Sequence, residues 1–186
     1  MHRLFVAVDL PETIKDRLAE ICFGLPGAKW VKPEQLHLTL RFIGEVDGAT
    51  FMDIRAALAT IALPPFSLGL KGLGCFPPRK TPRVLWVGLE PPLEQLVQLR
   101  NRVEATLVRL GVEPEHRKFA PHITLARLKE TPKNRLANFL AGNSLFSTES
   151  FPVENFHLYS SSIGSKGAIH TLEASYPLTG STDTMA

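Results

Sequence analysis

The stretch HLTLRF at residues 37–42 recurs, nearly unchanged, as HITLAR at residues 122–127. Both stretches alternate polar and apolar residues, which is typical of a strand with one buried face. The two copies lie almost half the chain length apart in a sequence of 186 residues. A motif that recurs at this spacing predicts two pseudo-symmetric lobes, each of which contributes one strand to a shared central cleft.

Each copy of the motif is predicted to present an imidazole beside a hydroxyl. Residues two positions apart in a strand share a face, so His37 points the same way as Thr39, and His122 the same way as Thr124. The residues between them are expected on the opposite, buried face; these are Leu38, Leu40, Phe42, Ile123 and Leu125. Two such strands that face each other would place two imidazoles and two hydroxyls around one cavity.

The arginines of the two motifs differ in their predicted position. Arg41 lies four residues after His37, so simple alternation puts it on the face of His37. Arg127 lies five residues after His122 and is expected on the opposite face, unless a bulge turns it back or a position at the strand end lets its long side chain curl back. Whether either arginine reaches the cavity is left open by the pattern.

Two imidazoles and two hydroxyls suit the cleavage of a phosphodiester. That reaction needs a base to deprotonate the attacking oxygen and an acid to protonate the leaving oxygen. A histidine, with an ordinary pKa of about 6.5, can fill either role near neutral pH. The two threonine hydroxyls can donate hydrogen bonds to the non-bridging phosphate oxygens, and Arg127 can add charge-assisted hydrogen bonds.

The rest of the chain predicts an α+β fold in which antiparallel sheets are flanked by helices. Helices are expected over 12–23, 50–62, 92–110 and 132–141, where apolar residues recur at helical spacing. Strands are expected over 3–10, 36–43, 66–76, 83–89 and 121–128, and over 151–178 around a turn at GSKG (164–167). We expect residues 1–178 to form one bilobal catalytic domain and 179–186 to be a disordered tail.

Composition indicates where the protein is located and which partners its charge permits. No apolar run approaches the roughly 20 residues needed to cross a bilayer, and the N-terminus lacks the pattern of a signal peptide, so a cytoplasmic protein is expected. Cys22 and Cys75 have no metal-ligand spacing and are expected to be buried, reduced thiols. The net charge of +3 permits a polyanionic partner but predicts only local contacts with it.

The two motifs and their surroundings resemble the 2H phosphoesterase superfamily, and more closely the bacterial and archaeal RNA 2′,3′-cyclic phosphodiesterases, first described as 2′-5′ RNA ligases. The resemblance spans essentially the whole chain. Its segments are RLFVAVDLP at the start, WVKPEQLHLTLRFIGEV at 30–46, KFAPHITLAR at 118–127 and LYSSSIGSKGAIHTL at 158–172. One departure is His170, which stands where the family often has a tyrosine.

The resemblance implies a bilobal fold with an antiparallel sheet in each lobe and the site in the cleft between them. It implies hydrolysis of a terminal 2′,3′-cyclic phosphate of RNA to a 2′-phosphomonoester without a metal or other cofactor. It assigns His37 as proton donor and His122 as proton acceptor. Thr39, Thr124 and Arg127 become the phosphate-binding residues. The implied partner is an RNA end, with tRNA fragments among the candidates, and a monomer is expected.

Three other functions remain open at this point. The same site could catalyse reversible 2′-5′ ligation, because a catalyst of one direction also serves the reverse. The chain could instead be a binding module for RNA ends, although binding alone needs no matched acid and base. A metallohydrolase would require a third ligand, and no Asp, Glu or Cys stands beside either motif to supply one.

Several other residues are predicted to be structural or exposed. His2, His116, His157 and His170 lack a matched partner in the sequence. The basic turn PPRKTPR (77–83) is expected to be solvated, with contact to RNA as the alternative. Trp30 and Phe119 precede the motifs and could stack on a base, but packing is an equal alternative.

Overall fold

The fold is built on two antiparallel sheets of four strands each. A computed structural model describes residues 1–180 of the chain. Sheet A has the strand order β10 (Gly167–Pro177), β9 (Asn155–Gly164), β1 (His2–Asp9) and β3 (His37–Val46). Sheet B has the order β2 (Ala28–Trp30), β7 (Ile123–Leu128), β6 (Val84–Leu89) and β5 (Leu70–Phe76). A third sheet pairs β4 (Phe66–Leu68) with β8 (Phe151–Val153).

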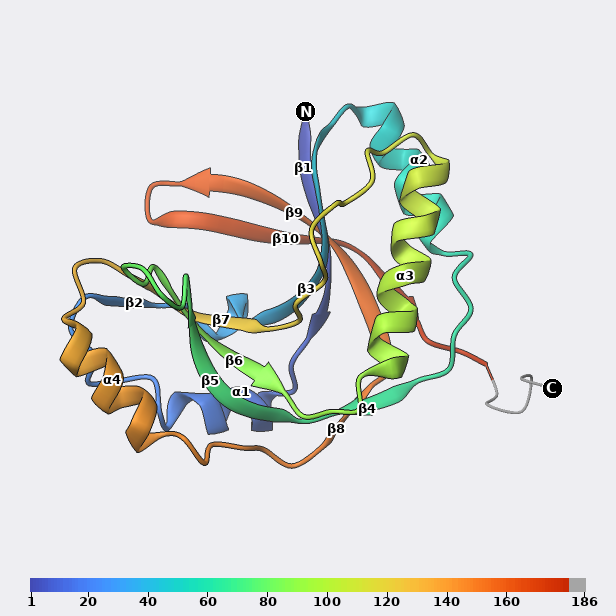
Figure 1. The fold of residues 1–186 in the computed structure, drawn as a ribbon. Helices are drawn as coiled ribbons and strands as arrows, with labels where there is room; N and C mark the ends of the chain where they lie inside the picture. Colours follow the sequence, from blue (N-terminus) through green and yellow to red (C-terminus); the bar gives the residue numbers. More distant parts are fainter. Residues whose placement is uncertain (181–186) are drawn as a thin grey trace.

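Four helices flank the sheets, as the apolar periodicity predicts. They are α1 (Glu12–Ala19), α2 (Gly48–Leu58), α3 (Glu94–Arg109) and α4 (Lys133–Gly142). The α3 helix buries one face, formed by Leu96, Leu99, Val103 and Leu107, because these residues recur at intervals of three and four. The α2 helix begins at Gly48 because the side chain of Asp47 accepts a hydrogen bond from the backbone of Thr50 at 2.7 Å. Figure 1 shows α2 and α3 side by side along one flank of the molecule.

The two motif strands meet where the sheets adjoin. After β2, the chain passes Val31, whose backbone N–H donates to the carbonyl of Leu125 in β7 at 2.9 Å. It then forms a short 3-10 turn (Pro33–Gln35) and enters β3 at His37. This connection joins an edge strand of sheet B to an edge strand of sheet A, so β3 and β7 lie in contact (Figure 1).

The predicted α+β class, the antiparallel pairing and the four helices are confirmed, and the differences concern boundaries. The expected strand over 66–76 is divided into β4 and β5, which belong to different sheets, and the short strand β2 was not expected. The segment over 151–178 forms β8 and the hairpin of β9 and β10, whose turn lies within the GSKG segment. Residues 179 and 180 form neither helix nor strand, and the remainder of the predicted tail, 181–186, lies outside the described residues.

Candidate active site

Both motif strands carry one extra residue at the same place in the motif. In sheet A, Thr39 pairs with Ala7 and Arg41 pairs with Val6, so Leu40 has no partner of its own. In sheet B, Thr124 pairs with Trp86 and Ala126 pairs with Leu85, so Leu125 is the extra residue. Such a bulge reverses the alternation of faces beyond it.

The bulge in β7 brings Arg127 to the histidine side of the sheet. Arg127 pairs with Val84, which is two residues from Trp86 and therefore shares the face on which Trp86 and Thr124 lie. The side chain of Arg127 is exposed there. The phosphate-binding candidate Arg127 thus lies on the face of His122, and it does so through a bulge, which is one of the two routes that the sequence left open.

The bulge in β3 has the opposite effect on Arg41, and two predictions are wrong for this reason. Arg41 turns to the buried face, where only 7% of its surface is exposed. It pairs there with Glu104 of α3 at 2.5 Å, and it donates to the carbonyl of Glu113 at 2.5 Å. Phe42, expected in the core, lies instead on the face that carries His37 and is 61% exposed. We call the two sheet faces that carry His37 and His122 the histidine faces.

On sheet A, an aromatic cluster surrounds His37. Phe5 lies at its centre and is buried, with the rings of His37, Phe42, Tyr159 and His170 around it at centroid distances of 4.9–5.9 Å. His37 also contacts His170 directly, with a centroid distance of 5.1 Å and an interplanar angle of 69°. The sequence predicts His170 to be structural or exposed, whereas the structure places it against the first motif histidine.

A carboxylate borders this cluster. Asp9 pairs with His37 across β1 and β3 and accepts a hydrogen bond of 2.6 Å from the hydroxyl of Tyr159. His157 lies on its other side, with Nε2 3.5 Å from Asp9 Oδ2 and Nδ1 2.8 Å from the hydroxyl of Ser175. Burial lowers the pKa of His157, although Asp9 opposes this. Burial and the hydrogen bond to Asp9 both raise the pKa of Tyr159, which therefore stays protonated as a donor.

His122 has a different aromatic neighbourhood on sheet B. Its ring meets Phe76 edge-on at 5.1 Å and lies 6.3 Å from Trp86. The indole of Trp86 lies so close to Gly74 that a Cβ at that position would stand 2.2 Å from it, so only glycine fits there. Nδ1 of His122 is 2.7 Å from the carbonyl oxygen of Ala120, which orients the ring and leaves Nε2 for chemistry.

Burial, and to a smaller extent the charge of the neighbouring His170, lower the pKa of His37 to about 4 in the free protein. The backbone of Gln35 and the carboxylate of Asp9 raise it, but less. His37 is therefore neutral at pH 7 in the free protein. Because the pKa in the folded state lies below the ordinary value of 6.5, the unfolded chain binds more protons between pH 6.5 and 4, and stability falls as the pH drops through that range.

This shift gives a direct prediction. In an NMR titration of the free protein we expect the His37 ring to titrate near pH 4, and we expect saturating inorganic phosphate to raise that pKa, since a nearby negative charge favours imidazolium. Exposed His116 serves as the reference and should not respond to phosphate. A His37 pKa of 6 to 7 in the free protein, unchanged by phosphate, would contradict the prediction.

Other predicted residues lie away from this site. Trp30 pairs with Ala126 on the buried side of sheet B and contacts Phe139 of α4 at 6.0 Å, which fits packing. Phe119 lies under the guanidinium of Arg100. Cys22 and Cys75 are free and only half-buried, and burial raises the pKa of the Cys22 thiol to about 11. Within residues 1–180, no three His, Cys, Asp or Glu side chains are grouped to hold a metal ion.

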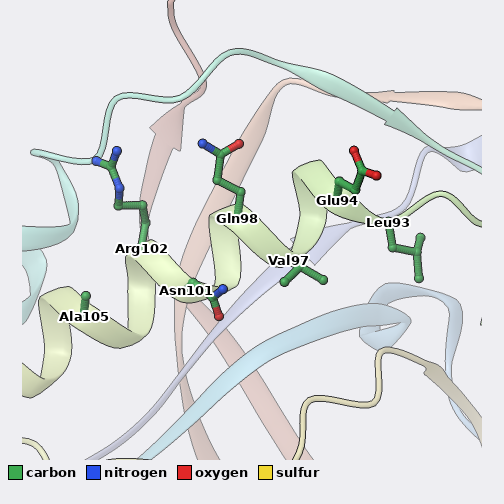
Figure 2. Close-up of a pocket in the computed structure, with 7 residues that line it drawn as sticks. All are labelled: Leu93, Glu94, Val97, Gln98, Asn101, Arg102 and Ala105. Atoms are coloured by element: carbon green, nitrogen blue, oxygen red, sulfur yellow. The ribbon is translucent and has the colours of Figure 1, made fainter. Parts of the chain in front are cut away.

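A surface hollow on α3 is also separate from the motif histidines. Figure 2 shows its side chains projecting from the outer side of the helix; they are Leu93, Glu94, Val97, Gln98, Asn101, Arg102 and Ala105. None of them belongs to either motif. A second hollow lies between α2 and the end of β10 and likewise contains no motif residue.

Two antiparallel sheets that each carry one His-x-Thr motif define the class of two-histidine phosphoesterases. A family model for LigT-like phosphoesterases matches the chain twice, over residues 8–86 and 87–170, and each match contains one motif histidine. The chain belongs to this family. Its two matched halves agree with the pseudo-symmetry that the repeated motif predicts.

Relatives and solved structures agree with this assignment. The chain is 36% identical over 172 residues to the RNA 2′,3′-cyclic phosphodiesterase of Archaeoglobus fulgidus, covering 90% of this chain and 96% of the relative. The crystal structure of TT0787 of Thermus thermophilus matches with a TM-score of 0.80 at 31% identity, over 95% of this chain and 97% of that one. The crystal structure of E. coli LigT complexed with 3′-AMP matches with a TM-score of 0.79 at 29% identity, over 96% and 99%.

Proposed function

We propose that this protein hydrolyses a 2′,3′-cyclic phosphate at the end of an RNA to a 2′-phosphomonoester. The observation that carries the proposal is the matched pair of motifs, which puts a histidine and a threonine side by side on a face of each of two adjoining sheets. Relatives that share about a third of the sequence over most of the chain are RNA 2′,3′-cyclic phosphodiesterases.

In the proposed reaction, the two histidines serve as base and acid. His122 takes a proton from the attacking water, and His37 gives a proton to O3′ as its bond to phosphorus breaks. Thr39 and Thr124 donate hydrogen bonds to the non-bridging oxygens, and Arg127 offsets the charge that the phosphate carries in the transition state. Because the phosphate is itself an anion, its arrival favours the protonated form of His37 that the donor role requires.

The surroundings of His122 also suit an RNA end. The β5–β6 turn begins directly after Phe76, which contacts His122, and it carries the exposed residues Arg79 and Lys80. Cations in such a turn can contact a backbone phosphate upstream of the cyclic end.

The proposal also includes the setting of the protein. We propose that it is a cytoplasmic monomer, that residues 1–178 form one catalytic domain, and that tRNA fragments are candidate substrates. Among residues 1–180, no helix is long and apolar enough to cross a membrane.

The test is incubation with a short RNA that ends in a 2′,3′-cyclic phosphate. We expect turnover to a 2′-phosphomonoester at an undiminished rate in EDTA, because the two proton transfers need only imidazoles. Phosphorus NMR of the product identifies the position of the phosphate. A 3′-phosphate product, or activity that chelation abolishes and a divalent ion restores, would overturn the proposal. An RNA with a 3′-hydroxyl end is the matched control and should be unchanged.

A further inference from the structure

His170 occupies a position that the roles proposed above do not use. It lies on β10 opposite Ser161 of β9, and it shares the histidine face with Tyr159 and Leu172 because Leu172 pairs with Tyr159. Two rings lie against it, those of His37 at 5.1 Å and Phe5 at 4.9 Å, both edge-on. The second imidazole of sheet A therefore stands directly beside the first.

The two nitrogens of this ring have different surroundings. Nδ1 is enclosed and has no hydrogen-bond partner. The residue as a whole is only half-buried, and enclosure without a partner is found for Nδ1 but not for Nε2, so we place the open edge of the ring at Nε2. A buried ring nitrogen without a polar partner is best accommodated as an N–H directed at an aromatic face, here that of Phe5 or His37. This leaves Nε2 available to a ligand on the open side.

The charge of the site favours an anion as that ligand. Burial lowers the pKa of His170, so the free protein presents two adjacent neutral imidazoles. A phosphate near both of them would favour protonation and convert Nε2 of His170 into a charge-assisted donor. Tyr159 donates its hydroxyl to Asp9, and Phe5 and Leu172 have no polar group, whereas His170 brings a polar ring against His37.

We propose that His170 is a third phosphate-binding histidine, which donates a hydrogen bond from Nε2 to the terminal phosphate group that His37 faces. This inference rests on the proposed function for the identity of the ligand.

The test measures phosphate binding directly, without turnover. His170→Phe keeps a ring against Phe5 and His37 but removes both nitrogens, and His170→Gln keeps an N–H donor near the position of Nε2. Because His170→Phe loses a charge-assisted hydrogen bond to the anion, we expect it to bind inorganic phosphate about ten- to a hundredfold more weakly. His170→Gln should retain most of the affinity. Calorimetry measures both, and thermal melting shows that each variant is folded.

Leu172→Ala is the matched control, because Leu172 lies on the same face of β10, two residues away, and has no donor. Its phosphate affinity should equal that of the wild type. The inference would be overturned if His170→Phe bound phosphate as tightly as the wild type. This holds even if the substitution altered the pKa of His37. His170→Tyr adds a second check, since a tyrosine hydroxyl should restore part of the binding.

The two proposals can fail separately. If the wild type hydrolyses cyclic ends and the Michaelis constant of His170→Phe is unchanged, the role of His170 is wrong and the proposed function stands. If the wild type binds phosphate through His170 but leaves cyclic ends intact, the proposed function is wrong and the binding site stands.

Discussion

Replacing either His37 or His122 by alanine lowers kcat on a cyclic-phosphate RNA end by a factor of about 10²–10⁴ or more, because each variant lacks one of the two proton transfers. The double variant is expected to be little slower than the slower single variant, since both groups act in one transition state. Steady-state kinetics on the purified variants measures these factors. His116→Ala, which removes an exposed histidine outside the motifs, is the control and should keep full activity.

Substrates with different leaving groups assign the two roles. A good leaving group at O3′ needs no proton, so it should rescue loss of the acid much more than loss of the base. Rescue of His37→Ala alone supports His37 as donor and His122 as acceptor. Rescue of His122→Ala alone would reverse the assignment. Thr39→Ala and Thr124→Ala should each cost less than loss of a histidine, because proton transfer remains in place.

The second large effect concerns the buried ion pair of Arg41 and Glu104. Their side chains are 6% and 15% exposed, and Glu104 also accepts a hydrogen bond of 2.9 Å from the backbone of Glu115. Burial raises the pKa of Glu104, but the hydrogen bonds from Arg41 and Glu115 outweigh it and the net pKa is lowered. Glu104→Ala leaves the guanidinium buried without its partner, so we expect a loss of unfolding free energy of roughly 3 kcal/mol.

Chemical denaturation measures this loss, and two variants make the result specific. The double variant Arg41→Met with Glu104→Leu removes both charges and should recover most of the stability, because an apolar pair of similar size avoids desolvation. Glu20→Ala breaks the exposed ion pair with Arg17, and its free energy of unfolding should be close to that of the wild type. If Glu104→Ala were as stable as Glu20→Ala, the buried pair would have no structural role.

This pair also connects the two halves of the site. Arg41 follows Thr39 by two residues, and its guanidinium donates to the carbonyl of Glu113 in the segment between α3 and His122. We therefore expect Glu104→Ala to lower kcat as well as stability, although it touches no reacting group.

The sequence predicts the symmetric part of the site well, because its signal is local. Alternation alone places His37 beside Thr39 and His122 beside Thr124, and the family resemblance adds the fold. The bulges at Leu40 and Leu125 were not predictable from one sequence, since neither position carries a glycine that would mark a bulge. Both errors of face, at Arg41 and Phe42, follow from the first of these bulges.

The aromatic cluster around His37 was missed for a different reason. Phe5, Tyr159 and His170 come from three strands that are distant in sequence and adjacent in sheet A. Only the pairing of β1 with β9 and of β9 with β10 brings them together, and no spacing along the chain records it. One signal was available, because the family resemblance implies a tyrosine at position 170 and so marks His170 as a departure.

The two motifs differ at their sixth residue, which is Phe42 in the first and Arg127 in the second. The bulges turn both residues to the histidine faces, so one half presents a benzyl group and the other a guanidinium. Two identical halves would accept an RNA end in either of two directions, related by the pseudo-twofold axis. With a hydrocarbon on one side and a permanent cation on the other, we expect the sugar–phosphate chain to enter in a single direction, which in turn gives each histidine one fixed duty in every turnover.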